Sequence, residues 1–414
     1  MRDPKFSPSP RDAAPQGHWW TLVKRCAPRG GVGVQPHKVR RQMRTLISST
    51  EGAGHFGPLV PFIEALKRRG DDLLVVGPPG LAGMVEAGGY RFREGAEPPA
   101  EELGAIWQRV GSATPEEAAV LVNREVFGRL DTAAMLPTLE RVCDEWAPDL
   151  VLRDPCEYAS ALAAERRGIP HAQVAISLAE VEAGSLNLAA GVLEPYRRGI
   201  VEALEASPYL TRLPGSVDPS PFPHTVRFRE PRYASAGALA GWWGDDDRPL
   251  IYATLGSVAG TRPIGAAAYR TVIDAVAPLP ARVLLTIGRD ADPSSLDPLP
   301  ENLHVEPWVP QKDVLPHAAL VVCHGGSGTT FGALAAGVPL VLLPLFADQP
   351  VNARLVSDAG AGITVSPHEP ASRLRDAIRT VLNDPAHKDA AARIATEMNE
   401  ASSIDDVLAD LAPR

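Results

Sequence analysis

Short apolar runs alternate with longer amphipathic segments along most of the chain, and this alternation restricts the fold more than any other feature. The run Thr45–Ser49 is typical of a short buried strand. In the segment that follows, Leu59, Ile63 and Leu66 recur at helical spacing. A strand, helix, strand unit returns over residues 149–176. Such alternation predicts an α/β fold with parallel sheets covered by helices on both faces.

The alternation lapses once, in a stretch rich in proline and glycine, and resumes at Leu250. We therefore predict a Rossmann-like domain over residues 43–225, a linker over residues 226–248 and a second Rossmann-like domain over residues 249–395. The C-terminal helical segment, residues 396–414, is expected to pack back on the first domain. Two doubly wound domains facing across a cleft would bind ligands at the carboxyl ends of their strands.

Residues 1–42 differ from the rest of the chain in charge and pattern. They carry nine Lys and Arg residues and two Asp residues, which gives this segment a net charge of +7. Because the whole chain has a net charge of −9, the remaining residues carry −16. The segment has no periodic apolar pattern and no apolar core of the kind found in a signal peptide. We interpret it as a disordered basic extension, translated from upstream of a natural start at Met43. A basic interaction tail is the alternative.

Composition excludes several classes of function. The acidic balance argues against a nucleic-acid partner, which would require a basic face. The four cysteines show no CxxC spacing, which fits a reducing, cytoplasmic environment without structural zinc. The longest apolar stretch, residues 333–347, is interrupted by Gly337, Pro339 and Pro344 and is too short to span a membrane.

The most informative motif is a glycine-rich loop in the second domain. The apolar run Leu320–Cys323 leads directly into His324–Thr330, with the sequence HGGSGTT, which then opens a helix. Glycines allow backbone N–H groups to approach an anion, and a helix N-terminus adds positive potential. The loop therefore indicates a phosphate or diphosphate site without a lysine. A tight strand-to-helix turn remains the simpler alternative.

Polar and aromatic residues stand at two neighbouring strand ends. Trp308 could stack on a planar base, and Asp348 with Gln349 could bind sugar hydroxyls, so that with the glycine loop they describe a nucleotide-sugar site. Each also has an ordinary structural interpretation. Trp308 could fill the core, and Asp348 could cap the following helix.

The stretch from residue 308 to residue 352 strongly resembles the donor-binding box of the family 1 glycosyltransferases of GT-B fold, and within them the bacterial natural-product enzymes. The resemblance extends more weakly over the whole chain from Met43. It implies that Trp308, with Val309 and Gln311 beside it, stacks on the nucleobase, and that His324 contacts the diphosphate. It further implies that the diphosphate is surrounded by a phosphate cradle made of Gly326, Ser327, Gly328 and Thr329. Asp348 and Gln349 would bind the sugar hydroxyls, and Ser257 would face the diphosphate from the other side.

One position departs from the family pattern. Many members that use uridine donors carry a Glu eight residues after the histidine, where it binds both ribose hydroxyls, but this chain has Gly332 there. Loss of that carboxylate favours a thymidine-diphosphate sugar, whose sugar ring lacks the 2′-hydroxyl, over a uridine-diphosphate sugar.

The first domain should supply the base and the acceptor pocket. A hydroxyl that attacks an anomeric carbon must lose its proton, and His is suited to accept it near neutral pH. His55 lies after the first strand in the Gly-His-x-x-Pro setting in which the family places its base, and Asp154 follows a neighbouring strand, where it could orient the imidazole. The alternatives are an exposed His and an Asp turn before a proline. Trp107, Phe127 and Trp146 in the helical region 101–146, and loops near residues 180–193, are expected to wall the acceptor pocket. The alternative for the three aromatic residues is an ordinary place in the core.

The resemblance implies an inverting hexosyltransferase that uses a TDP- or UDP-sugar and a small-molecule natural-product acceptor. We expect no metal or other cofactor, because the one Asp-rich run, residues 245–247, lies in the linker. The protein would be a monomer or homodimer. Two alternatives remain open at this stage: a nucleotide-sugar 2-epimerase of the same fold, and a non-catalytic nucleotide-sugar-binding subunit, although the latter would typically lack the base.

Overall fold

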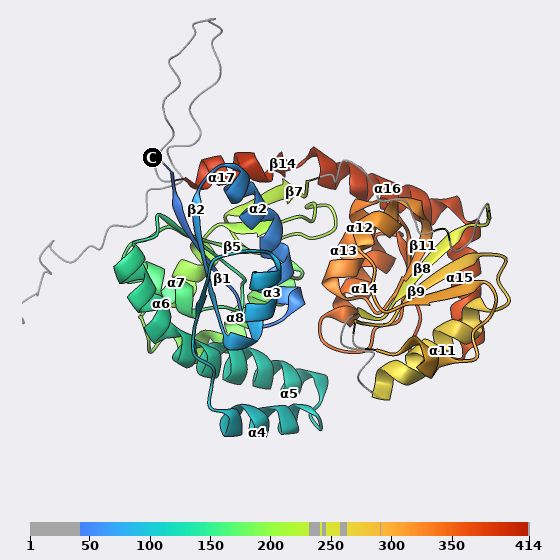
Figure 1. Cartoon of the computed structure of the whole chain (residues 1–414), viewed down its shortest axis with the longest axis horizontal. Helices are drawn as coiled ribbons and strands as arrows, with labels where there is room; N and C mark the ends of the chain where they lie inside the picture. The colour runs from blue at the N-terminus through green and yellow to red at the C-terminus, as the bar shows by residue number, and fades with distance from the viewer. Residues whose placement is uncertain (1–41, 232–240, 242–245, 257–262, 290, 413–414) are drawn as a thin grey trace, which may run out of the picture. The chain divides into compact units, whose positions relative to one another are not determined.

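The computed structural model describes residues 42–231, 241, 246–256, 263–289 and 291–412. Within these residues the chain forms two parallel sheets, each with helices on both faces (Figure 1). This is the fold that the alternation of strands and helices predicts. The N-terminal extension falls almost entirely outside the described residues.

The first sheet has the strand order β14-β7-β6-β5-β4-β1-β2-β3. Its paired neighbours are parallel. The strands are β1 (Arg44–Ser48), β2 (Asp72–Gly77), β3 (Phe92–Glu94), β4 (Leu150–Arg153), β5 (His171–Val174), β6 (Tyr209–Thr211), β7 (Thr225–Arg229) and β14 (Ser402–Ser403).

The second sheet has the order β10-β9-β8-β11-β12-β13, again with parallel neighbours. Its strands are β8 (Leu250–Thr254), β9 (Arg282–Thr286), β10 (Leu303–Glu306), β11 (Ala318–Cys323), β12 (Leu340–Leu342) and β13 (Gly362–Thr364). The central strands are buried on both faces, because alternate residues pack into different cores. In β8, Ile251 and Ala253 join one core and Leu250 and Tyr252 the other.

Helices connect the strands and cover both faces of each sheet. In the first half they are α1 (Ala53–Phe56), η1 (Gly57–Leu59), α2 (Val60–Arg68), η2 (Pro79–Leu81), α3 (Ala82–Ala87), α4 (Ala100–Val110), α5 (Pro115–Val120), η3 (Leu121–Asp131), α6 (Thr132–Trp146), α7 (Ala159–Glu165), α8 (Ala179–Leu193) and α9 (Ile200–Ala206). In the second half they are α11 (Pro263–Val276), η4 (Pro293–Leu296), α12 (Gln311–Val314), η5 (Leu315–His317), α13 (Ser327–Ala335), α14 (Gln349–Asp358), α15 (Ala371–Asn383), α16 (Pro385–Glu400) and α17 (Ile404–Leu411).

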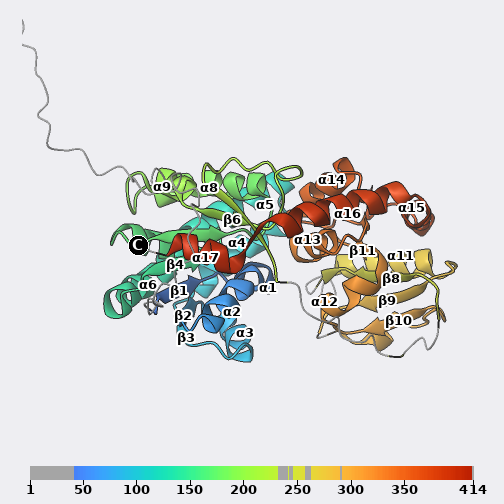
Figure 2. The same cartoon turned by 90° about the horizontal axis from the view of Figure 1, so that it is seen from above.

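The C-terminal segment returns to the first sheet (Figure 2). Strand β14 pairs with β7, and Ile404, Val407 and Leu408 of α17 are buried in the core that α2 also covers. Among the described residues, no helix has the length and apolarity needed to cross a membrane.

The structure moves two of the predicted boundaries. Strand β7 runs to Arg229 and pairs with both β6 and β14, so the first sheet extends past residue 225. Helix α16 crosses residue 396 without a break, so the predicted boundary falls inside a helix.

Candidate active site

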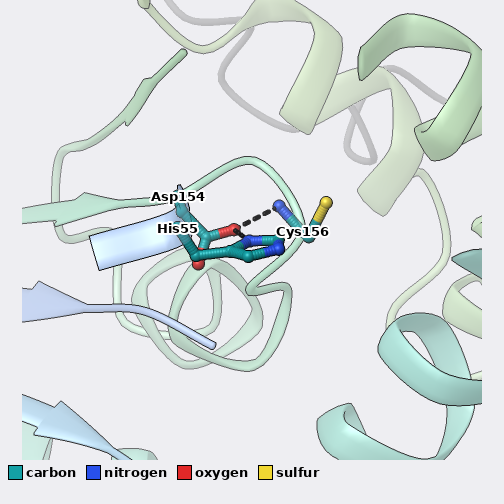
Figure 3. Close-up of side chains that lie close together, drawn as sticks. All are labelled: His55, Asp154 and Cys156. Carbon is teal, nitrogen blue, oxygen red and sulfur yellow. Dashed lines mark hydrogen bonds and ion pairs between the residues drawn. The ribbon is translucent and has the colours of Figure 1, made fainter. Parts of the chain in front are cut away.

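His55 and Asp154 meet because two neighbouring strands end at the same edge of the first sheet. The register pairs Ser48, the last residue of β1, with Arg153, the last residue of β4. His55 lies in α1 just beyond β1, and Asp154 immediately follows β4. The hydrogen bond expected between them is present, with 3.3 Å between Nδ1 of His55 and Oδ1 of Asp154 (Figure 3).

The Asp154 carboxylate is fully buried and richly hydrogen-bonded. Its Oδ2 accepts from the Thr50 N–H at 2.8 Å and from the Ser49 hydroxyl at 3.1 Å, and its Oδ1 accepts from the Cys156 N–H at 2.7 Å. Burial raises the pKa of Asp154, but His55 and these donors outweigh it, and the pKa lies below its usual value. The carboxylate is therefore ionised and held in one orientation.

The His55 imidazole remains accessible, with 22% of its side chain exposed. Burial lowers the pKa of His55, but the charge and hydrogen bond of Asp154 raise it by more, so the net pKa is above the ordinary value. Because Nδ1 is bound to Asp154, Nε2 is the nitrogen left to accept a proton. The pair has the arrangement of a general base and its orienting carboxylate.

Arg153 supports this pair and was not identified from the sequence. Its guanidinium is fully buried and donates to the backbone carbonyls of Asp154 and Pro155 at 3.0 and 3.1 Å, and to the Gln173 side chain at 3.3 Å. These bonds fix the loop that carries Asp154. An arginine at the end of an otherwise apolar strand was the available signal.

Cys156 lies beside the pair, and atoms of His55, Asp154 and Cys156 that could serve as metal ligands fall within 4.8 Å of one another. Burial raises the pKa of the Cys156 thiol well above its usual value, so the thiol is neutral. Figure 3 shows the sulfur pointing away from the imidazole and carboxylate. This chemistry fits a hydrogen-bonded dyad better than a set of metal ligands, which would require a thiolate.

In the second sheet, β11 leads into the glycine loop and α13, as predicted. The His324 ring lies between Gly256 and Gly326. A Cβ atom at Gly256 would lie 2.8 Å from the His324 ring, and one at Gly326 would lie 2.5 Å from His324 Nε2. Both positions therefore require glycine, and Gly256 also has a φ of +81°.

Burial lowers the pKa of His324 to about 4, against the opposite effects of Asp348 and the Thr254 backbone. The imidazole is thus neutral at neutral pH, and it would act on a diphosphate through a hydrogen bond instead of through positive charge. Its Nδ1 is buried without a hydrogen-bond partner. An orphaned polar atom at the N-terminus of a helix is a feature that an anionic ligand would satisfy.

Asp348 does not cap α14 through its side chain, which settles one of the alternatives raised by the sequence. Its Oδ2 instead accepts from Ser327 Oγ and Ser177 Oγ, both at 2.7 Å, and from Asn352 Nδ2 at 3.1 Å. Asn352 is fully buried and also donates to the Gly325 carbonyl at 2.9 Å. Ser177, which follows β5, and Asn352 were missed from the sequence.

Two predicted ligands are partly engaged within the protein. The side-chain oxygen of Gln349, a residue only 3% exposed, accepts from the Leu345 and Phe346 N–H groups at 2.7 and 2.9 Å. Gln311 donates to the Thr329 hydroxyl at 2.8 Å. These bonds shape the loops that carry the predicted donor-binding residues.

Trp308 is exposed, which argues against a role as core filler. Its side chain is 47% accessible, and the Arg289 guanidinium lies over the ring at 3.7 Å from its centroid. Val309 is partly buried against the second core. Gly326 and Ser327 are partly buried, whereas Gly328 is exposed at the start of α13. Ser257 lies outside the described residues.

The aromatic residues expected to wall the acceptor pocket occupy different environments. The Phe127 ring lies 5.4 Å from the His55 ring, centroid to centroid, whereas Trp107 is 46% exposed and Trp146 packs on the core beneath α6. In the Asp-rich run, Asp245 is outside the described residues and Asp246 pairs with Arg248 at 2.6 Å.

Comparison with known proteins shows the family of this chain. Residues 108–248 and 270–412 match the models for the N-terminal and C-terminal domains of the erythromycin biosynthesis protein CIII-like family. Elloramycin glycosyltransferase ElmGT of Streptomyces olivaceus is 30% identical over 400 residues, 89% of this chain and 97% of that protein. L-demethylnoviosyl transferase of Streptomyces niveus is 30% identical over 365 residues, 86% of this chain and 94% of that protein.

Among solved structures, the glycosyltransferase SnogD of Streptomyces nogalater superposes with a TM-score of 0.71 at 25% identity, over 90% of this chain and 99% of that one. Fold and relatives together define a glycosyltransferase of GT-B fold. The chain belongs to the bacterial natural-product branch of the family 1 glycosyltransferases.

Proposed function

We propose that the protein transfers a hexose with inversion from a thymidine- or uridine-diphosphate sugar to a hydroxyl of a small-molecule natural product, with His55 as general base. The observation that carries this proposal is the hydrogen bond from His55 to the buried, ionised Asp154, which leaves Nε2 as the proton acceptor. The Asp154 negative charge stabilises the imidazolium that forms as the acceptor is deprotonated.

The bonds made and broken balance around these residues. His55 Nε2 takes the acceptor proton, the acceptor oxygen bonds to the anomeric carbon, and the bond from that carbon to the diphosphate oxygen breaks on the opposite face. An α-linked D-hexose donor would therefore give a β-linked product. The leaving nucleoside diphosphate keeps the electron pair, and the α13 N-terminus and the neutral His324 side chain are placed to stabilise it. We propose that these groups suffice without a metal ion.

Gly332 supports a thymidine donor. It lies in α13 one turn beyond Gly328, and a Cβ atom there would meet only Leu315 and Gln311, at 3.4 and 3.7 Å. The position could sterically hold a side chain, yet it offers no carboxylate for a ribose 2′-hydroxyl.

A single-turnover assay tests the proposal. Wild type and His55→Ala are mixed with TDP-glucose or UDP-glucose and a panel of planar phenols, with EDTA present. We expect metal-independent formation of a β-glucoside by wild type, faster with TDP-glucose, and none by His55→Ala despite unchanged donor binding. Retained turnover in His55→Ala would overturn the role of the base, and a requirement for added metal would overturn metal independence. Donor binding with no transfer to any phenol would instead contradict the proposed acceptor class.

A further inference from the structure

The two oxygens of the Asp348 carboxylate have different surroundings. Oδ2 accepts three hydrogen bonds, from the hydroxyls of Ser177 and Ser327 and from the side-chain amide of Asn352. Among the described residues, no N–H or hydroxyl group donates to Oδ1. A carboxylate oxygen has about two lone-pair sites, so the protein itself saturates Oδ2, whereas Oδ1 keeps its capacity to accept a hydrogen bond.

Asn352 ties this carboxylate to the glycine loop. It lies in the first turns of α14, four residues after Asp348, and its side chain is fully buried. Its Nδ2 group donates to the Gly325 carbonyl at 2.9 Å and to the Ser327 hydroxyl at 3.0 Å, as well as to Asp348. A Cβ atom at Gly325 would lie 2.9 Å from the Gln349 carbonyl oxygen, so the loop and the start of α14 are in close contact. Asn352 therefore holds the loop and Asp348 together as one unit.

Ser177 reaches the same carboxylate from the first half of the chain. It follows β5 and is buried. Its N–H group and that of Ile176 both donate to Glu182 Oε1, each at 2.6 Å, and Glu182 is itself buried in the first turn of α8. The turn that carries Ser177 is thus held to α8, and the Ser177 hydroxyl lies 2.7 Å from Asp348 Oδ2.

Asp348 interacts electrostatically with both histidines of the candidate site. Burial lowers the pKa of His55 and of His324, and in each case the Asp348 charge acts in the opposite direction. A hexose joined to a diphosphate on the glycine loop, and attacked from the side of His55, must occupy the region between these two groups. Asp348 is therefore near the position that such a sugar would take.

We infer that Ser177 and Asn352 are positioning residues for the donor sugar: they hold Oδ2 of Asp348, so that Oδ1 accepts a hydrogen bond from a sugar hydroxyl. This inference rests on the proposed function, because it takes a nucleotide sugar as the donor. Neither residue needs to touch the sugar. The first half of the chain would contribute to donor recognition through Ser177, in addition to carrying the base.

Calorimetric titration of the full chain with TDP and with TDP-glucose separates recognition of the sugar from recognition of the nucleotide. Ser177→Ala and Asn352→Ala should each weaken TDP-glucose relative to TDP at least about fivefold, because a hydrogen bond to an ionised carboxylate is among the stronger ones. Ser177→Ala should bind TDP alone as wild type does. Ser177→Thr retains the hydroxyl and should restore the binding of TDP-glucose.

A double-mutant cycle tests whether Ser177 and Asn352 act through Asp348. Once Asp348→Ala has removed the carboxylate, adding Ser177→Ala or Asn352→Ala should change the ratio of the two dissociation constants by less than about twofold.

Two matched controls accompany the cycle. Ser185→Ala removes a hydroxyl that donates to the Val181 carbonyl within α8, and Asn383→Ala removes an amide that donates to the Arg379 carbonyl within α15. Neither control should alter the ratio.

An unchanged ratio in Ser177→Ala and Asn352→Ala, or tighter binding of TDP-glucose by them, would overturn the inference. A loss that persists in the Asp348→Ala background would also overturn it, because the residues would then act other than through the carboxylate. If Asn352→Ala does not fold, the Ser177 variants decide the outcome. Failure of wild type to bind either TDP or TDP-glucose would instead contradict the proposed function, and the inference with it.

Discussion

His55 and Asp154 are 99 residues apart in the chain, yet their side chains share a hydrogen bond of 3.3 Å at the edge of the first sheet. The partner of the base is the more deeply buried of the two, and its remaining lone pairs are taken by backbone and hydroxyl donors. The Asp154 carboxylate that orients the imidazole is thus itself held in place by hydrogen bonds.

Replacing Asp154 by Asn should reduce turnover about 10²- to 10⁴-fold, the range typical of a lost general-base function. Removal of the negative charge destabilises the imidazolium, so the pKa of His55 should fall and the acid limb of the pH–rate profile should move to lower pH. Both effects are measured in one pH series of kcat/KM. Cys156→Ser is the matched control, because it keeps the N–H bond to Asp154 and should retain wild-type activity. An unchanged profile in Asp154→Asn would rule out the orienting role.

Gly326→Ala should weaken the binding of nucleoside diphosphate at least tenfold, which is about 1.4 kcal/mol. The added Cβ atom would lie 2.5 Å from His324 Nε2 and must displace the ring from the diphosphate loop. Gly104→Ala, in α4 of the first half, is the matched control, since nothing lies within 4 Å of a Cβ atom there. Titration of both variants with TDP checks this, and equal affinities would show that the His324 position is not needed for binding.

Gly332→Glu should move the donor preference toward uridine-diphosphate sugars by at least about tenfold, a difference of 1.4 kcal/mol. The new carboxylate would stand at the position from which the family binds a ribose 2′-hydroxyl, and a Cβ atom there would meet Leu315 and Gln311 at 3.4 and 3.7 Å. Competition between TDP-glucose and UDP-glucose measures the ratio. Gly332→Ala controls for the change in helix propensity, and a shift of the same size in that variant would refute recognition by the carboxylate.

Arg289→Ala should tighten donor binding about two- to fivefold, corresponding to loss of a cation–π contact worth about 0.5 to 1 kcal/mol. The guanidinium covers a face of Trp308 on which a nucleobase could stack, and the donor must displace it. Quenching of tryptophan fluorescence by TDP follows the binding. Weaker binding in the variant would mean that Arg289 contacts the donor instead of competing with it.

Asp131→Asn should stabilise the protein increasingly as pH rises from about 4 to above 7. The folded protein holds the Asp131 proton with a pKa of about 7, above the ordinary value of 3.8, so the native state binds more protons than the unfolded chain in this window. Ionisation therefore favours unfolding, and the substitution removes a penalty on the order of 1 to 3 kcal/mol. Thermal unfolding at pH 5 and pH 8 measures it. Glu116→Gln, on an exposed helix end, is the matched control.

The sequence by itself determined the α/β class, the two parallel sheets and the strand-to-helix position of the glycine loop. These features are local: apolar runs define buried strands, and the loop from His324 to Thr330 carries its strand and helix with it. The short strands β3 and β6 and the edge strand β14 were missed, because each has two or three residues and little apolar periodicity.

Only the tertiary structure decided the geometry with which distant residues meet. The sequence analysis already paired His55 with Asp154, but the bond between the Ser177 hydroxyl and Asp348 joins segments that no sequence pattern linked. Whether a histidine is neutral or a carboxyl protonated depends on burial and on neighbouring charges from other elements, as at His324 and Asp131. Such quantities arise from contacts between segments remote in the chain, and no local pattern of residues encodes them.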